Sequence, residues 1–196
     1  MVDNILFLDF DGVINRNSSD DKKLVISECL EVLLILIKKY NLKVVPICGA
    51  LFVGEGTNNT KKKIVNRLNS YGVFDIDGFI EPNYCGSFLD IELSSRTIGI
   101  VDYLKKRGNV NYVIIDDDYK REYKLLGLNH ICTKPYIGLT MDVLNDFILK
   151  KNTCYGFDKV IYDYRDLSDA KFIVNSNNLV KVLKKVYEKR SNDLWK

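Results

Sequence analysis

Short hydrophobic runs alternate along the chain with segments of helical periodicity, and this alternation predicts an α/β fold. Three runs of apolar residues, each closed by a polar or glycine stop, are typical of buried strands. They cover residues 4–9 (NILFLD), 42–47 (LKVVPI) and 111–116 (NYVIID), and a shorter strand is expected within 130–135. Because strands separated by helices usually pair in parallel, we expect a mainly parallel central sheet within a layered α/β domain.

Four helices are predicted between and after these strands from their apolar spacing and their end residues. Ser27 is a candidate N-cap of the first helix and Asn41 a left-handed stop, while Thr140 is a candidate N-cap of the last. The four segments are 26–41, 60–72, 94–108 and 138–151. Residues 74–93 show no clear period, and they are predicted to be irregular or weakly extended.

Residues 151–196 form a C-terminal extension that we expect to pack on the same domain as residues 1–150. A strand pair is possible around 159–164 and 171–175, and 177–190 (NNLVKVLKKVYEKR) predicts a basic amphipathic helix. We favour a helix that packs its apolar stripe on the body and leaves its lysines in solvent. A helix that faces nucleic acid is the weaker alternative, because few aromatic residues interleave with the lysines.

Acidic residues follow two of the predicted strands. Asp9 and Asp116 close the first and third strands, and Cys48 follows the second. Carboxyl ends of parallel strands meet at one edge of a sheet, where such folds bind ligands, so these residues are expected to lie together. Asp11 stands two residues after Asp9, and neighbouring carboxylates repel each other. Either the pair lies in a solvated turn or a cation lies between the two acids.

An all-carboxylate cluster without histidine or thiolate suits Mg²⁺, which commonly binds one or two carboxylates together with a substrate phosphate. Beside such an ion, Asp9 can attack a phosphorus atom as a covalent nucleophile. Asp11 can protonate the leaving oxygen and then activate water. Gly12 allows the backbone to approach the phosphoryl group closely.

The composition bears on the metal, the cellular compartment and the partners of the protein. The chain has five cysteines, an odd number with no CxxC pair, and one histidine, His130, which disfavours a zinc cluster and favours reduced thiols in a cytoplasmic protein. A formal net charge of +3 is too small to indicate a nucleic-acid or membrane partner. No apolar run is long enough to span a bilayer, so no membrane association is expected.

Two strand-end motifs together resemble one known family. FLDFDGVI resembles the first motif of the haloacid dehalogenase (HAD) superfamily in its phosphatase form, and YVIIDDD resembles the fourth. The order SSRTIGIVDYLKKRGNVNYVIIDDD followed by KPYIGLT is similar to a compact subgroup from Swiss-army-knife RNA repair proteins. The resemblance covers about residues 4–150 and implies a Rossmann-like three-layer fold with a minimal cap or none.

This resemblance also implies roles for individual residues. Asp9 corresponds to the nucleophile and a metal ligand, and Asp11 to the general acid/base that lends its backbone carbonyl to the metal. Asp116 and Asp117 complete the Mg²⁺ shell directly or through water. Arg96 stands where the family has a third-motif cation, usually Lys. The alternative for Arg96 is a surface cation at a helix start.

The second motif departs from the family pattern. The family has Ser or Thr at the end of the second strand to bind the phosphoryl group, whereas this chain has Cys48 followed by Gly49. A thiol is a poor hydrogen-bond donor, so backbone N–H groups at Gly49 and Ala50, or the hydroxyl of Thr57 or Thr60, are the candidate substitutes. Cys48 itself is expected to be a buried small residue rather than a nucleophile.

The sequence therefore predicts a Mg²⁺-dependent phosphomonoester hydrolase. The segment between Gly49 and Arg96 is too short for a large cap, and an open site favours a bulky phosphorylated substrate: a nucleotide, a polynucleotide end or a phosphoprotein. Nucleic acid is thus a candidate partner. The alternative, suggested by Cys48, is a catalytically degenerate HAD-fold protein that binds a phospho-ligand or has a regulatory role. The oligomeric state is left open.

Overall fold

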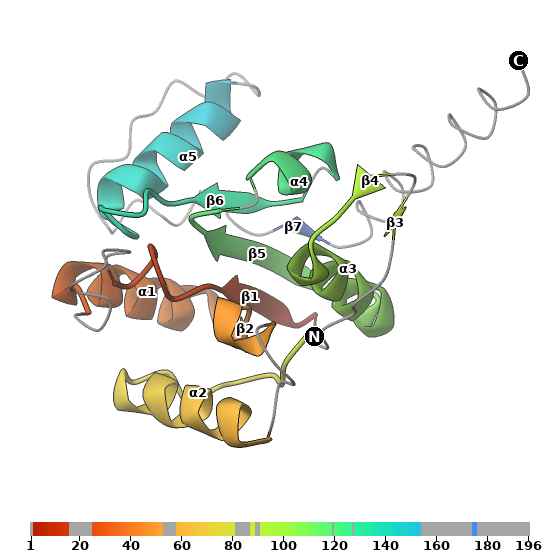
Figure 1. Cartoon of the computed structure of the whole chain (residues 1–196). Helices are drawn as coiled ribbons and strands as arrows, with labels where there is room; N and C mark the ends of the chain where they lie inside the picture. The colour runs from red at the N-terminus through yellow and green to blue at the C-terminus, as the bar shows by residue number, and fades with distance from the viewer. Residues whose placement is uncertain are drawn as a thin grey trace, which may run out of the picture.

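Four parallel strands form the central sheet in the spatial order β2–β1–β5–β6 (Figure 1). The computed structural model describes residues 2–15, 25–52, 58–80, 87–88, 91–118, 120–126, 128–153 and 174–175. The four strands are β1 (Asn4–Leu8), β2 (Leu42–Pro46), β5 (Asn111–Asp116) and β6 (His130–Cys132). In register, Leu6 of β1 pairs with Val44 of β2 and with Val113 of β5. The predicted parallel α/β sheet is confirmed.

Helices cover both faces of this sheet and make it the middle of three layers. The helices are α1 (Ser27–Tyr40), α2 (Asn58–Ser70), α3 (Ser95–Arg107), α4 (Lys120–Leu125) and α5 (Met141–Thr153). Successive side chains of a strand point to opposite faces. Leu6 and Leu8 therefore join the core under α1, α2 and α5, while Ile5 and Phe7 join the core under α3 and α4.

Two smaller pairings lie outside the four-strand path. β7 (Val174–Asn175) pairs antiparallel with the start of β5, with Val174 opposite Tyr112. β3 (Ser87–Phe88) and β4 (Ile91–Glu92) form a separate antiparallel pair between α2 and α3. A single bridge also joins Ile76 in parallel to Val44, so the chain beyond α2 runs along the outer edge of β2.

The helix ends agree with the sequence at most positions. Asn41 has a φ of 48° in the left-handed region after α1, and the Thr140 hydroxyl accepts a 3.3 Å hydrogen bond from the Val143 amide before α5. Ser27, however, is wrong as an N-cap, because Ile26 takes that position and no side chain caps α1. The sequence patterns also did not predict α4, which is six residues long.

Much of the C-terminal extension lies outside the described residues. This applies to the predicted basic helix at 177–190 and to the first strand of the predicted pair, while the second strand is described only at Val174–Asn175. How residues 151–196 pack therefore stays a prediction. Over the part of the chain that is described, no helix has the length and apolar character needed to cross a membrane.

Candidate active site

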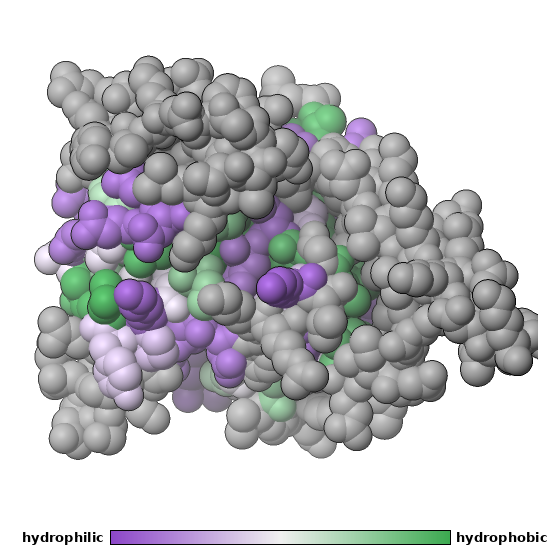
Figure 2. Space-filling view, turned by 90° about the horizontal axis from the view of Figure 1, so that it is seen from above, coloured by the Kyte–Doolittle hydropathy of each residue, from purple (hydrophilic) through white to green (hydrophobic). Residues whose placement is uncertain are grey.

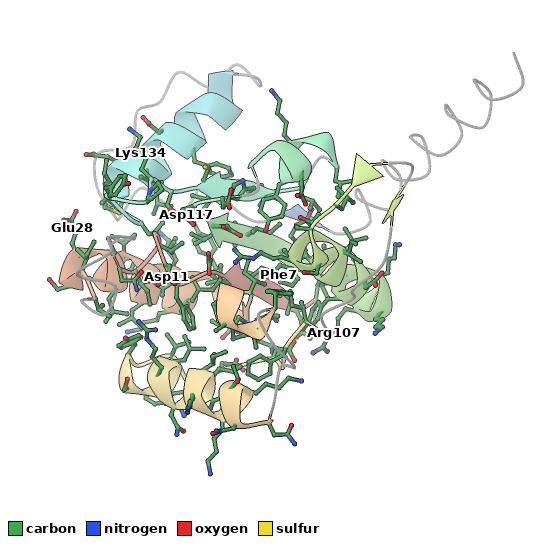
Figure 3. All side chains as sticks on the ribbon, in the orientation of Figure 1. Phe7, Asp11, Glu28, Arg107, Asp117 and Lys134 are labelled. Carbon is green, nitrogen blue, oxygen red and sulfur yellow. The ribbon has the colours of Figure 1, made fainter. Side chains whose placement is uncertain are left out.

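The chain segments that carry the predicted catalytic residues meet at one edge of the sheet. Asp9 follows β1, Asp116 ends β5, and Cys48 lies two residues beyond β2. Because these strands are parallel, all three positions fall at the carboxyl edge. Figure 3 labels Asp11 and Asp117 toward the left, the direction in which the arrowheads of β5 and β6 point.

Three carboxylates converge at this edge. Asp9, Asp116 and Asp117 each offer an oxygen, and these oxygens lie within 4.8 Å of one another. Asp9 and Asp116 are buried, whereas Asp117 is partly exposed. Buried acids need a positive partner, since desolvation strongly disfavours an unpaired charge.

Arg96 supplies a positive charge between two of the acids. Its Nη1 atom donates to Oδ2 of Asp9 at 2.9 Å and to Oδ2 of Asp116 at 2.8 Å. Arg96 is 6% exposed and lies in the first turn of α3, where the helix dipole opposes a cation. Burial lowers the pKa of Arg96, but the charges of Asp9 and Asp116 outweigh burial and raise it above its usual value. The surface-cation alternative is therefore wrong.

Asp116 is held by further donors on both of its oxygens. The phenol of Tyr123 donates to Oδ2 at 2.9 Å, and the amide of Asp118 donates to Oδ1 at 2.9 Å. The Tyr123 ring meets the His130 ring edge-on at 4.7 Å, and His130 Nε2 lies 2.9 Å from the backbone carbonyl oxygen of Asp116. Since a carbonyl only accepts, this nitrogen is the protonated one. These contacts fix the end of β5 from the α4 side.

The environment of Asp9 opposes its ionisation. Burial raises the pKa of Asp9 to about 7, with the nearby charge of Asp116 acting in the same direction. Arg96 and the Phe10 amide, which donates to Oδ1 of Asp9 at 2.8 Å, lower the pKa and limit the rise. An additional cation would therefore favour the carboxylate form of Asp9.

Gly12 allows the two acid-bearing loops to approach each other. Its φ is +74°, and a Cβ atom built on Gly12 would lie 2.2 Å from Oδ2 of Asp117. The Thr133 hydroxyl donates to the Gly12 carbonyl at 2.8 Å and ties this loop to the end of β6. Asp11 is exposed, and its Oδ1 accepts from the side-chain Nδ2 of Asn15 at 2.8 Å. Only Gly fits both the backbone and the space here.

A sequence model of the family described as "HAD domain in Swiss Army Knife RNA repair proteins" matches residues 5–144. The chain belongs to this HAD family. The match includes Asp9, Arg96 and Asp116, which the structure brings together. HAD domains are generally hydrolases, phosphatases among them. No curated protein gave a significant match to the chain.

The second HAD motif position lies beside this group of charges. Cys48 is buried, and burial raises the pKa of its thiol to about 12, so the thiol is neutral. Gly49 begins a short 3₁₀ turn, η1 (Gly49–Leu51), and a Cβ on Gly49 would lie 3.7 Å from Nη2 of Arg96. The backbone at Gly49 is thus close to the buried guanidinium. Thr57 lies outside the described residues, and Thr60 lies in α2.

Two residues that contact the HAD motifs were missed by sequence reasoning, namely Tyr123 and Thr133. Tyr123 lies in the unpredicted helix α4, and nothing in the sequence separates it from the other tyrosines. Thr133 follows β6, in line with Asp9 and Asp116 at the ends of their strands. The strand-end position was therefore the available signal for Thr133, although its hydroxyl binds the protein backbone.

Proposed function

We propose that this HAD protein is a Mg²⁺-dependent phosphomonoester hydrolase that works through an aspartyl-phosphate on Asp9. The observation that carries the proposal is the convergence of Asp9, Asp116 and Asp117, with oxygens within 4.8 Å of one another. Two of these acids, Asp9 and Asp116, pair with a buried arginine. Membership of a family whose domains are generally hydrolases supports it.

The donor set fits Mg²⁺. All three side chains offer carboxylate oxygens, which Mg²⁺ prefers, and among the described residues no histidine or thiolate belongs to the group. In this proposal Asp9, Asp116 and Asp117 hold the ion together with the backbone carbonyl of Asp11. When bound, Mg²⁺ neutralises negative charge on the substrate phosphate and on Asp9.

In this proposal the reaction has two steps, phosphoryl transfer to Asp9 and hydrolysis of the resulting aspartyl-phosphate. A carboxylate oxygen of Asp9 attacks phosphorus, and the bond from phosphorus to the leaving oxygen breaks while Asp11 donates its proton to that oxygen. In the second step, Asp11 takes a proton from water as the water attacks phosphorus. The bond to Asp9 then breaks, which releases inorganic phosphate and restores the carboxylate.

Backbone donors take the place of the absent hydroxyl of the second motif. Cys48 carries a neutral thiol, a poor donor, so the phosphoryl oxygens are bound by the N–H groups of Gly49 and Ala50. The N–H of Gly12 already donates to the Asn15 carbonyl at 3.1 Å. Arg96 lies beside Gly49 and adds positive charge at the same place. Cys48 also motivates the second candidate function, a HAD-fold module that binds a phospho-ligand without turnover.

An open site favours a large substrate. Asp11 is exposed, so a phosphate on a bulky carrier can approach it: a nucleotide, a polynucleotide end or a phosphoprotein. We also propose a cytoplasmic location, because the chain has an odd number of cysteines and no CxxC pair, which favours reduced thiols.

Hydrolysis of an aryl phosphate with and without Mg²⁺ tests the proposal. We expect Mg²⁺-dependent turnover in the native chain, loss of turnover in Asp9→Asn, and native turnover in Asp75→Asn. Asp75 is the matched control, because it is an exposed acid beside β2 and away from the site. Equal background release by all three proteins would instead contradict turnover and favour the binding module.

A further inference from the structure

An exposed aromatic side chain lies in the turn that follows β6. Tyr136 is 72% exposed and its neighbour Ile137 is 45% exposed. Among the described residues, the other exposed large hydrophobics are Val2 and Phe74, which are not adjacent in the chain. Figure 2 shows hydrophobic and hydrophilic surface side by side at its left end, the end toward which β5 and β6 point in Figure 1.

The turn 134–138 is anchored to the loops that carry the acids. On one side of it, the Thr133 amide donates to the Asp116 carbonyl at 3.1 Å, and the Thr133 hydroxyl donates to the Gly12 carbonyl at 2.8 Å. On the other side, the Leu139 amide donates to the Val13 carbonyl at 2.8 Å. Hydrogen bonds therefore fix both ends of the turn to the loops of the proposed active site.

The turn is also closed internally. The amides of Ile137 and Gly138 both donate to the Lys134 carbonyl at 2.9 Å. Pro135 restricts the backbone. Gly138 has a φ of +81°, and a Cβ atom there would lie 2.7 Å from the Val13 carbonyl oxygen, so this end of the turn is tightly packed. Tyr136 is thus displayed by an ordered backbone, and it has only two side-chain torsions to fix on binding.

A cation accompanies the aromatic. Lys134 is exposed at the start of the turn, and Figure 3 labels it toward the same edge as Asp117. Proteins that bind single-stranded nucleic acid combine aromatic side chains, which stack on the bases, with positive charges, which bind the phosphates. A phosphopeptide uses the positive charge, but it does not regularly present a flat ring next to the phosphate.

We propose that Tyr136 stacks on the terminal base of a polynucleotide whose end phosphate lies at Asp9, with Ile137 packing on that base and Lys134 meeting the next phosphate. The proposal rests on the proposed function, and it adds a base-binding subsite for one of the substrates proposed there, a polynucleotide end. It assigns Tyr136 to recognition of the base and gives it no part in the chemical step.

Binding of labelled oligonucleotides tests this subsite. The protein is the full chain with Asp9→Asn, in Mg²⁺, so that the ligand is not consumed. The ligands are single-stranded oligonucleotides phosphorylated at the 5′ or the 3′ end, each compared with a partner that lacks only the terminal base. Fluorescence anisotropy gives the dissociation constants.

We expect the base-bearing end to bind about 5- to 150-fold more tightly than the abasic end, the range that stacking of one base supplies. Adding Tyr136→Ala should remove this difference, and Tyr136→Phe should keep it. Phe74→Ala is the matched control and should also keep it. Phe74 is 75% exposed, but it lies before Asp75, beside the start of β2 and at the opposite edge of the sheet.

Lys134→Gln gives an independent measurement. Replacing one phosphate-binding cation should reduce the slope of log affinity against log salt by about 0.7 for a single strand. The preference for the base-bearing end should remain in this variant, because Tyr136 is intact. An unchanged salt slope would contradict the role of Lys134.

Equal binding of base-bearing and abasic ends by the chain with Tyr136 intact would overturn the proposal. So would a phosphotyrosine peptide whose binding depends on Tyr136 while the oligonucleotides bind without that dependence. Hydrolysis of glycerol phosphate by the native chain tests the catalytic proposal separately, because this substrate has no ring to stack. Base-dependent binding without hydrolysis would reject the catalytic proposal and keep the subsite.

Discussion

The phenol of Tyr123 donates a 2.9 Å hydrogen bond to Oδ2 of Asp116, the oxygen that also accepts from Arg96. Asp116 is fully buried, and its other oxygen accepts the Asp118 amide. Arg96, the Tyr123 hydroxyl and the Asp118 amide thus together fix the orientation of the Asp116 carboxylate. Tyr123 is therefore a positioning residue for one of the proposed metal ligands.

Tyr123→Phe should weaken Mg²⁺ binding by about 10- to 100-fold, the range typical for loss of a group that orients a metal ligand. Titration calorimetry with Mg²⁺ measures this without relying on turnover. Tyr112→Phe is the matched control, since Tyr112 is equally buried on the same face but its hydroxyl only accepts a 3.4 Å contact from the Asn129 amide. Equal Mg²⁺ affinity in the two variants would show that Tyr123 contributes to packing and does not orient the metal ligand Asp116.

Arg96→Ala should lower the free energy of unfolding by about 3–5 kcal/mol, because it leaves two buried carboxylates without their cation. Arg96→Lys should lower it less, since the charge remains while the planar guanidinium is lost. Denaturant unfolding measures both. Mg²⁺ should restore more stability to Arg96→Ala than it adds to the native chain, and an equal gain in the two would argue against a metal between these acids.

Stabilisation by Mg²⁺ should increase with pH. Burial raises the pKa of Asp9 to about 7, above the ordinary value of 3.8. Between these values the folded chain keeps a proton that the unfolded chain releases. Without metal, the contribution of Asp9 to stability is therefore full below about pH 4 and is lost as the pH rises toward about 7. Bound Mg²⁺ holds Asp9 ionised and so competes with that proton.

Thermal unfolding at about pH 5.5 and about pH 8, with and without Mg²⁺, checks this prediction. The shift caused by Mg²⁺ should be larger at the higher pH. In Asp9→Asn, which cannot release this proton, the pH dependence of the shift should be smaller. A native shift that is the same at both pH values would contradict the coupling.

Gly12→Ala should abolish Mg²⁺-dependent turnover, because its Cβ atom would lie within 2.2 Å of Oδ2 of Asp117 and would displace that acid. The positive φ adds a cost of about 1–2 kcal/mol for a non-glycine residue. Gly78→Ala separates the two effects, since Gly78 has a φ of +79° with nothing within 4 Å of the added atom. Gly78→Ala should lose stability and keep turnover. Loss of turnover in both variants would make the effect a matter of folding alone.

The thiol of Cys48 should resist alkylation at neutral pH. Burial raises its pKa to about 12, so the reactive thiolate is scarce. Peptide mapping after iodoacetamide treatment should find Cys48 unmodified in the native protein and modified after unfolding in urea. Rapid alkylation of the native chain, with loss of turnover, would point instead to a cysteine nucleophile.

The sequence predicted the sheet and the convergence of its acids for a simple physical reason. β1 and β5 are nearly continuous apolar runs, Asp9 follows the first, and Asp116 ends the second. Parallel pairing brings such strand ends to one edge whatever their separation in the chain. The position of Arg96 near the start of α3 was also predicted, because the sequence assigns residues 94–108 to a helix. In the structure, the Ser94 side chain caps that helix. The roles assigned to these residues came from the family resemblance.

The contacts that orient the acids were not visible in the sequence. α4 is too short for its periodicity to be read, so Tyr123 could not be placed on a helix or directed at Asp116. The hydrogen bond from Thr133 to Gly12 joins the end of β6 to the first loop, and it depends on how the strands pair. Ser27 was mistaken for a cap because the residue type suits a helix start, whereas the helix begins one residue earlier than that assignment requires.

The antiparallel pairing of β7 with β5 bears on where this protein can be cut. β6 pairs with β5 only from Ile114 onward, and Val174 lies opposite Tyr112 on the earlier part of that strand. A fragment that stopped at residue 144, where the family match ends, would leave this stretch of a central strand without those backbone hydrogen bonds. We therefore predict that a shortened protein is prone to intermolecular strand addition at this exposed stretch of β5.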